Sequence, residues 1–425
     1  MKRVLIVSPH FPPTNAADCH RVRTYLPHLA SLGWQAEVLC VEPADVFASQ
    51  DPLLCESLPD HVPIHRVPAR ATLLQWLARG KTLGPRSFRF LRSHGDRLLH
   101  PRTFDLVFFS TTAFTVFRLG PRWKQRHGVP FVIDLQDPWV NDFYRLNPEI
   151  TPPGGRLRHF RADRQARRWE QRVLAAAAAV VSVSPRYRSD ILARHPQLGD
   201  LPWLVLPFGA SAADFELLDD CAVKQSRFDP RDGRKHIVYV GRGGPDLEAS
   251  LTRLFEAFAR LLDMDSDTAG RLSFHFFGTS YAPEGRLRDS VMPLAEKAGV
   301  ARWVEEQPSR IPYFEALRCL RDAHGLFLPA SADTGYNPSK VYNLLLAGRP
   351  LLAIAPGGSV AERELSRFAG AMTLADSEGQ SQQAVLDWLK TVSNQQQITL
   401  PTSIDCESAS QARKLVELFN AVTRN

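Results

Sequence analysis

Two series of short apolar runs, each separated by helix-length segments, constrain the fold of this chain most strongly. Short apolar runs of this kind are typical of buried parallel strands, because helices cover both faces of a parallel sheet. The first series comprises 4–7, 36–41, 106–109, 131–135 and 179–183, and the second comprises 236–240, 272–277, 325–328 and 351–354. The pattern predicts an α/β protein with two doubly wound parallel sheets.

The length of 425 residues fits two domains better than one hydrophobic core. We expect an N-terminal domain over 1–207, a linker over 208–233 and a second domain over 234–404. The linker lacks clear periodicity and ends in a charge-rich stretch. The segment 405–425 carries an amphipathic pattern, which predicts a final helix.

Composition and cysteine spacing exclude several protein classes. With 44% hydrophobic and 23% charged residues, the chain resembles an ordinary globular protein rather than a disordered one. Its six cysteines lie far apart, with no Cys-x-x-Cys pair to indicate zinc or redox chemistry. No apolar run approaches the roughly 20 residues needed to span a bilayer, and the first run is too short for a signal peptide. We therefore expect a cytoplasmic protein.

A helix start in the second domain has the chemistry of a phosphate site. After the apolar run 325–328, Asn337 is suited to the N-cap and Pro338 to the first helical position, and Gly348 is suited to the end. Lys340 then falls in the first turn, where the positive helix dipole disfavours a cation and an anion would offset the cost. Asn343, one turn further on, would reach a ribose hydroxyl. The alternative is a surface lysine and asparagine on an ordinary helix.

A second candidate phosphate contact follows the strand 236–240. Arg242 comes directly after this strand, at the carboxyl edge where open α/β sheets bind ligands, and a guanidinium can pair bidentately with a diphosphate. Gly241 belongs to the same loop. Gly243 and Gly244 would let the backbone approach a ligand, although a Gly-Gly pair more often marks a turn.

In the first domain, two carboxylates bracket the end of the strand 131–135. Asp137 would orient a sugar hydroxyl or stabilise positive charge at an anomeric carbon, and Trp139 offers a flat face for a sugar or lipid. The alternative for Asp137 is a backbone cap ahead of Pro138. Asp134 has the position of a structural residue.

The motif from Pro338-Ser339-Lys340 through Ala347-Gly348-Arg349-Pro350 resembles the donor-site signature of retaining GT-B glycosyltransferases of family 4. Weaker similarity extends over nearly the whole chain, at 11–13, 134–139, 181–184 and 239–242. The resemblance implies two Rossmann-like domains that face each other across a cleft, with the last helix returning to the first domain. It also implies that Ser339 and Lys340 bind the donor nucleotide, that Arg21 faces the diphosphate from the first domain, and that no metal or cofactor is needed.

The function implied is transfer of a sugar from a nucleotide-sugar donor to a carbohydrate or lipid-linked acceptor, with retention, in cell-envelope or exopolysaccharide synthesis. The chain departs from the family pattern because the two glutamates of its E-x7-E pair fall on Gly335 and Asn343. A lysine usual after the Gly-Arg pair is missing, and Asn15-Ala16-Ala17 stands where two glycines are common. These departures leave two alternatives open, a non-catalytic nucleotide-sugar or glycan-binding subunit and a GT-B-fold sugar-nucleotide epimerase.

The net charge of +7 is unevenly placed, with a basic stretch at 156–172 and another at 81–102. Such stretches can attract anionic lipid headgroups, so we expect peripheral contact of 156–172 with the inner face of a membrane. Solvated helix faces are the alternative. Nucleic acid is not an expected partner, because few aromatic residues interleave with these arginines.

Overall fold

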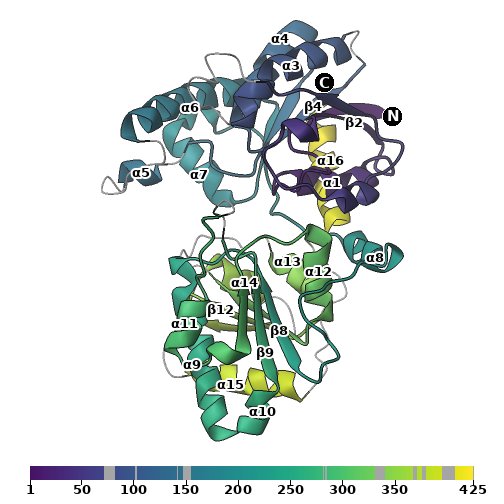
Figure 1. Ribbon diagram of the computed structural model, residues 1–425. Coiled ribbons are helices and arrows are strands. Elements are labelled where there is room, and N and C mark those ends of the chain that lie inside the picture. Colours follow the sequence, from purple (N-terminus) through teal and green to yellow (C-terminus); the bar gives the residue numbers. More distant parts are fainter. Residues whose placement is uncertain are drawn as a thin grey trace. The chain divides into compact units, whose positions relative to one another are not determined.

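The computed structural model describes residues 1–70, 82–100, 103–140, 142–146, 155–280, 282, 285–330, 340–366, 371–375, 380–394 and 407–424. The chain forms two compact units (Figure 1). The first comprises Met1–Phe208 together with Ser408–Asn425, and the second comprises Gly209–Glu407. The first unit therefore ends one residue after the predicted boundary and includes the C-terminal helix.

The first domain is built on a seven-stranded sheet in the order β3-β2-β1-β4-β5-β6-β7, in which every pair is parallel. The strands are β1 (Lys2–Val7), β2 (Trp34–Val41), β3 (Ile64–Val67), β4 (Leu106–Ser110), β5 (Phe131–Leu135), β6 (Ala179–Ser182) and β7 (Trp203–Val205). The five predicted strands are all present. The edge strands β3 and β7 escaped prediction because they are short and partly exposed.

Helices cover both faces of this sheet, as strand alternation requires. The helices are α1 (Cys19–Leu29), α3 (Leu83–Leu98), α4 (Leu119–His127), α5 (Phe143–Leu146), α6 (Arg156–Ala176), α7 (Pro185–Arg194) and α16 (Ser408–Val422). Val4 and Ile6 share a core with α1 and α16, which lie side by side in Figure 1, whereas Leu5 and Val7 share a core with α3, α4 and α6.

The C-terminal helix α16 completes the core of the first domain. Phe419 packs edge-on against Trp34 and Phe108, with ring centroids 5.4 and 5.2 Å apart. Tyr25 of α1 donates a hydrogen bond to Gln411 of α16 at 2.5 Å. The helix α1 ends at Leu29, ahead of Gly33 with its positive φ of 89°.

The second domain has a six-stranded parallel sheet in the order β10-β9-β8-β11-β12-β13. The strands are β8 (Lys235–Val240), β9 (Leu272–Phe277), β10 (Val304–Gln307), β11 (Gly325–Pro329), β12 (Leu351–Ala355) and β13 (Ala371–Ala375). The four predicted strands are present. Here too the missed strands, β10 and β13, lie at the sheet edges, and β10 has the polar sequence Val-Glu-Glu-Gln.

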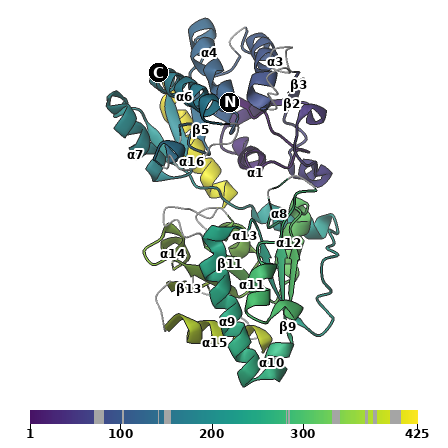
Figure 2. The same cartoon turned by 60° about the vertical axis from the view of Figure 1, so that its left-hand side comes forward.

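Its helices are α8 (Ala212–Asp220), α9 (Glu248–Met264), α10 (Ser266–Gly270), α11 (Met292–Lys297), α12 (Tyr313–Asp322), α13 (Val341–Leu346), α14 (Val360–Leu365) and α15 (Gln380–Ser393). Figure 2 shows α9 with α11 beside it, and Phe258 of α9 packs edge-on against Phe274 of β9 at 4.8 Å. The predicted linker 208–233 is, apart from Phe208, part of this domain. The segment belongs to this domain because helix α8 packs against it. Phe215 of α8 is buried, and Asp214 of α8 accepts a hydrogen bond from the hydroxyl of Tyr313.

The strand order reverses between β1 and β4 in the first sheet and between β8 and β11 in the second. Open α/β sheets bind ligands beyond the carboxyl ends of their strands at such a reversal. Ligands are therefore expected to bind at the loops that follow these four strands.

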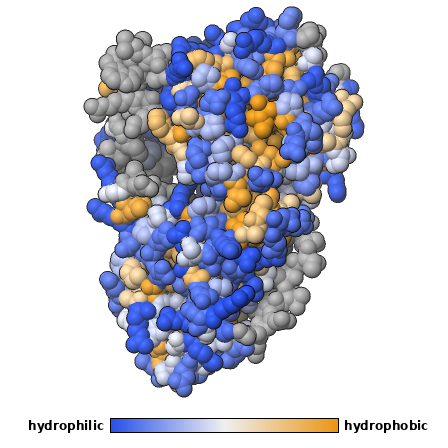
Figure 3. Space-filling view, turned by 45° about the vertical axis from the view of Figure 1, so that its right-hand side comes forward, coloured by the Kyte–Doolittle hydropathy of each residue, from blue (hydrophilic) through white to orange (hydrophobic). Residues whose placement is uncertain are grey.

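Hydrophilic residues cover most of the face shown in Figure 3, and hydrophobic residues gather there in patches. Among the helices that the structure describes, none is long and apolar enough to cross a membrane.

Candidate functional site

In the second domain, the structure brings Lys340 and Gly241 together at the strand-order reversal. A Cβ atom added to Gly241 would lie 2.1 Å from the Nζ of Lys340 and 2.5 Å from the Oη of Tyr239. The Nζ atom lies 5.6 Å from the centroid of the Tyr239 ring. A residue without a side chain is therefore required at position 241, because any side chain there would displace the amine of Lys340.

The electrostatics of this position favour an anion. Burial, together with the charges of Arg242 and Arg310, lowers the pKa of Lys340 to about 8. No carboxylate pairs with Lys340 within the part of the chain that the structure describes. A partly desolvated cation without a counter-charge is costly, and a bound anion would reduce that cost.

Arg242 lies beside Lys340 but already has a partner. Its guanidinium donates two hydrogen bonds to the carboxylate of Asp246, at 2.7 and 2.6 Å. This is the fork geometry that the sequence suggested for a diphosphate. A phosphate contact from Arg242 would therefore have to share the guanidinium with Asp246 or displace it.

Gly243 and Gly244 are explained by packing and backbone conformation rather than by close approach to a ligand. A Cβ atom on Gly243 would lie 1.9 Å from the Oγ of Ser290. Gly244 has a φ of 149°, which other residues rarely adopt. These glycines shape the loop that carries Arg242.

The helix α13 supplies the remaining candidate in this domain. Asn337, Pro338, Ser339 and Gly335 lie outside the described residues, so the predicted helix start and E-x7-E position are untested there. Gly348 has the positive φ of 70° expected of a helix end. The Oδ1 atom of Asn343 is buried without a hydrogen-bond partner among the described residues. Such an oxygen is available to accept a hydrogen bond from a hydroxyl group.

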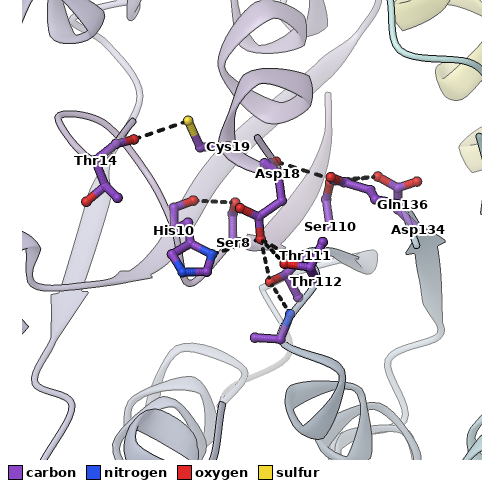
Figure 4. Close-up of polar contacts among 11 residues, drawn as sticks. Ser8, His10, Thr14, Asp18, Cys19, Ser110, Thr111, Thr112, Asp134 and Gln136 are labelled. Carbon is purple, nitrogen blue, oxygen red and sulfur yellow. Dashed lines mark hydrogen bonds and ion pairs between the residues drawn. The ribbon is translucent and has the colours of Figure 1, made fainter. Parts of the chain in front are cut away.

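In the first domain, a histidine–aspartate pair occupies the strand-order reversal (Figure 4). His10 follows β1, and its Nδ1 lies 2.9 Å from the Oδ2 of Asp18. The same oxygen accepts hydrogen bonds from the backbone N–H and hydroxyl of Thr112 and from the hydroxyl of Thr111, at 3.0 to 3.1 Å. Asp18 is buried, at 3% exposure, and Thr111 and Thr112 follow β4.

This arrangement holds the ring of His10 in place and favours the ionised form of Asp18. Burial acts to raise the pKa of Asp18, but His10 and Thr112 together lower it below its ordinary value. An ionised Asp18 favours the tautomer of His10 with its proton on Nδ1. The Nε2 atom of His10 then presents a lone pair, and among the described residues it has no hydrogen-bond partner. This pair was not predicted from the sequence, although a histidine just beyond the first strand of a doubly wound domain is a usable signal.

A cavity of 510 Å³ opens beside His10 within the first domain. Phe114 and Trp139 stack on each other along its wall, with ring centroids 5.9 Å apart and planes at 15°. The lining residues with charged or aromatic side chains include His10, Arg86, Phe114, Arg118, Trp139 and Trp169. Its volume is within the range of small-molecule sites, and Trp139, predicted as a packing face, lies in its wall.

Three candidates of the first domain remain. Arg21 and Asp134 form a buried structural ion pair, whereas the carboxylate of Asp137 is accessible. The Nε of Arg21 lies 2.9 Å from the Oδ2 of Asp134, both side chains are buried, and Arg21 also donates to the carbonyl of Leu206 at 2.7 Å. The structure therefore assigns Arg21 to the core of this domain, and it is not part of the donor site proposed below. Asp137 is exposed and has no side-chain partner among the described residues. Although the side chain is exposed, desolvation by the surrounding protein and the charge of Asp18 raise its pKa.

Comparison with known proteins gives a family for the first domain. Residues 20–209 match the family model described as a glycosyl transferase 4-like domain. The first domain is therefore similar to glycosyl transferase 4-like domains, and the chain has a GT-B fold. No curated protein matches the chain in sequence.

Solved structures share the GT-B fold over nearly the whole chain at low identity. A UDP-forming α,α-trehalose-phosphate synthase from Burkholderia xenovorans aligns over 100% of both chains, with 14% identity and a TM-score of 0.57. The N-terminal domain of Candida albicans trehalose-6-phosphate phosphatase aligns over 99% of this chain and 97% of that one, with 10% identity and a TM-score of 0.58. A putative UDP-N-acetylglucosamine 2-epimerase from Listeria monocytogenes covers 99% and 96%, with 11% identity and a TM-score of 0.52. The family domain and the fold support a role in glycosyl transfer or another sugar-nucleotide reaction.

Proposed function

We propose that this GT-B protein is a hexosyltransferase-like glycosyltransferase. It would transfer a sugar from a nucleotide-sugar donor to a carbohydrate or lipid-linked acceptor, in cell-envelope or exopolysaccharide synthesis. The observation that carries the proposal is Lys340, a half-buried lysine beside Gly241 with a pKa lowered to about 8 and no carboxylate partner among the described residues. An anionic ligand would compensate this charge, and a nucleotide diphosphate is such a ligand.

The donor would lie at the carboxyl ends of β8 and β11. Lys340 and Arg242 would hold the diphosphate, with Gly241 giving room and Ser339 in the adjoining segment. The Oδ1 of Asn343, which lacks a partner among the described residues, would accept a hydrogen bond from the ribose. These cations would neutralise the charge of the leaving diphosphate, so we propose a reaction without a metal or cofactor.

The acceptor would occupy the first-domain cavity. Its hydroxyl group would donate a hydrogen bond to the Nε2 of His10, whose ring Asp18 holds in place. With retention, as the resemblance to family 4 implies, the acceptor oxygen bonds to the anomeric carbon as the bond to the diphosphate breaks, and the proton passes to the leaving phosphate oxygen. His10 is then a positioning residue, and Asp137 would stabilise positive charge at the anomeric carbon.

A thermal-shift screen of nucleoside diphosphates tests the donor site, beginning with UDP because the similar synthase is described as UDP-forming. A diphosphate that binds the folded protein raises its melting temperature by an amount that increases with the ratio of ligand concentration to Kd. We expect a rise for the wild type and for Lys297→Gln, which changes an exposed lysine of the same domain, and none for Lys340→Gln. No rise with any nucleoside diphosphate, or an equal rise in Lys340→Gln, would contradict the proposal.

Two other functions have specific observations in their favour. Similarity to a putative UDP-N-acetylglucosamine 2-epimerase favours an epimerase, which would convert a nucleotide sugar with no acceptor present. The absence of both family glutamates, at Gly335 and Asn343, favours a non-catalytic binding subunit. Incubating nucleotide sugars with and without acceptors separates the three, because a binding subunit would show a thermal shift and no turnover.

We further propose a cytoplasmic enzyme that contacts the anionic inner face of a membrane through α6. Support comes from Leu157 and Phe160, which are 66% and 61% exposed, and from exposed arginines on the same helix. Apolar side chains flanked by arginines are typical of helices that bind the membrane interface. Cosedimentation with anionic but not neutral vesicles, reversed by high salt, is the expected result. Binding that does not depend on lipid charge would contradict it.

A further inference from the structure

The first-domain cavity has an excess of positive charge in addition to its aromatic wall. We infer that it binds an acceptor that carries a phosphate group, with Arg118 as the principal phosphate ligand and Trp139 as the packing face. This inference rests on the proposed function, because it names the substrate class of the acceptor site. It adds a chemical requirement that neither the family domain nor the fold supplies.

Arg118 differs from Arg122 and Arg126 in having no carboxylate partner among the described residues. Arg122 and Arg126, on the helix that follows, both pair with Asp96, at 3.3 and 3.5 Å. The guanidinium of Arg118 instead lies over the rings of Trp169 and Phe88, with its carbon 4.1 and 5.2 Å from their centroids. Its Nε is buried and has no hydrogen-bond partner among the described residues.

A second guanidinium in the wall is also incompletely satisfied. Arg86 is only 9% exposed, and its Nη2 donates to the carbonyl of Ala69 at 2.7 Å. Its Nη1 has no partner in the described part of the chain. A guanidinium has five N–H donors, so both arginines retain capacity for an anionic ligand.

The one carboxylate among the described lining residues does not cancel this charge. Asp163 of α6 lies 2.8 Å from the Nε of Arg167 and is neutralised there. Burial lowers the pKa of Arg118, and a nearby anion would stabilise its charged form. Phosphate suits this wall better than a neutral hydroxyl group, because several oxygens can accept from guanidinium donors.

The cavity size and its neutral residues limit the rest of the ligand. A volume of 510 Å³ accommodates a single sugar ring with its phosphate, and the stacked Phe114 and Trp139 offer an apolar face to that ring. His10 lines the same cavity and would receive the reacting hydroxyl. A soluble sugar phosphate and a lipid-linked phosphate share this chemistry, and the experiment below has an arm for each.

Titration calorimetry on the full chain tests the inference with two matched pairs of probes. One pair is glucose 6-phosphate and glucose, and the other is a short-chain polyprenyl phosphate and the corresponding polyprenol in detergent micelles. In the wild type, we expect the phosphorylated member of at least one pair to bind about tenfold or more tightly than its neutral partner. The pair that shows the preference identifies the source of the phosphate.

The variants assign the preference to the cavity. Arg118→Gln should abolish it, and Arg118→Lys, which keeps the charge without the planar fork, should retain part of it. Arg188→Gln changes an exposed arginine of α7 in the same domain that does not line the cavity, and should leave the preference intact. Absence of any phosphate preference in the wild type, or its full retention in both Arg118 variants, would overturn the inference.

Nucleoside diphosphate binding in the same samples separates this inference from the proposed function. Diphosphate binding that depends on Lys340, without a phosphate preference for the acceptor probes, would overturn only the inference about the cavity. A phosphate preference that depends on Arg118, without diphosphate binding, would uphold the cavity and contradict the donor site.

Discussion

The two strand-order reversals of this protein have the same topology and opposite electrostatics. In the first domain, the loops after β1 and β4 hold a hydrogen-bonded histidine–aspartate pair, because Asp18 accepts hydrogen bonds from His10 and Thr112. In the second domain, the loop after β8 and the segment after β11 bring Lys340 beside Arg242 without a carboxylate for Lys340 among the described residues. The comparison suggests that the first reversal is built to orient a neutral hydroxyl group and the second to receive an anion.

The largest expected effect follows from removing the cation of the second reversal. Lys340→Gln should lower kcat/KM for the nucleotide-sugar donor by about 10²- to 10³-fold, the usual effect of losing one group that stabilises charge in the transition state. Steady-state kinetics with Lys297→Gln as the control would measure it. A decrease in kcat/KM of less than about threefold would contradict the proposed electrostatic difference between the two domains.

Changing the first reversal should affect a different kinetic quantity. His10→Gln should lower kcat by roughly 10- to 100-fold, because the acceptor hydroxyl loses its positioning partner, while donor affinity stays at the wild-type value. Asp18→Asn should act in the same direction by releasing the histidine ring. If His10→Gln weakens donor binding instead, the division of roles between the two domains is wrong.

Gly241→Ala tests the space that the second reversal provides. The new methyl group would push the amine of Lys340 aside, and we expect about tenfold weaker nucleoside diphosphate binding. The methyl group would also lie 2.7 Å from the Cζ of the buried Tyr239 ring, so we expect some loss of stability, which urea unfolding measures separately from binding. Gly270→Ala is the matched control, since nothing lies within 4 Å of the added Cβ there. Equal effects of the two substitutions on binding would count against the arrangement.

The smallest expected effect is on the stability of the protein. It involves the buried histidines His236, near the amino end of β8, and His275 of β9. Burial, with a smaller contribution from the charge of His236, lowers the pKa of His275 to about 3, and its Nε2 lies 2.9 Å from the Nδ1 of His236. Because this pKa is below the unfolded value of about 6.5, the contribution is fully present above pH 6.5 and is lost as pH falls toward 3. Urea unfolding should show a loss of up to about 1.4 kcal/mol per pH unit below pH 6.5. The same slope in His275→Asn would exclude this histidine as its source.

The central strands were predictable from the sequence and the edge strands were not. Strands covered on both faces have continuous apolar runs, as in 131–135. The edge strand β10 has the polar, partly exposed sequence Val-Glu-Glu-Gln, which contains no apolar run from which a strand could be predicted. The proximity of Lys340 to Gly241 followed from a general rule, because adjacent parallel strands end at the same sheet edge.

The first-domain site depended on tertiary contacts that no local pattern reveals. Arg21 pairs with Asp134, which lies far along the chain, so its helical position gave no indication of burial. His10 and Asp18 lie in the loops and turns around β1 and α1, where periodicity is uninformative. Arg118 was not selected because its significance is the absence of a carboxylate partner, which becomes visible only when its neighbours are placed.

The pH dependence of nucleoside diphosphate binding tests the central claim most directly, because it reports the protonation of Lys340 in the donor site. With a pKa of about 8 in the unliganded protein, Lys340 is charged at pH 7 and largely neutral at pH 9. Calorimetric titration of the wild type should therefore give about tenfold weaker binding at pH 9 than at pH 7. Lys340→Gln should bind weakly and nearly equally at both values. Wild-type affinity that does not change between pH 7 and 9, or that changes equally in Lys340→Gln, would contradict the account.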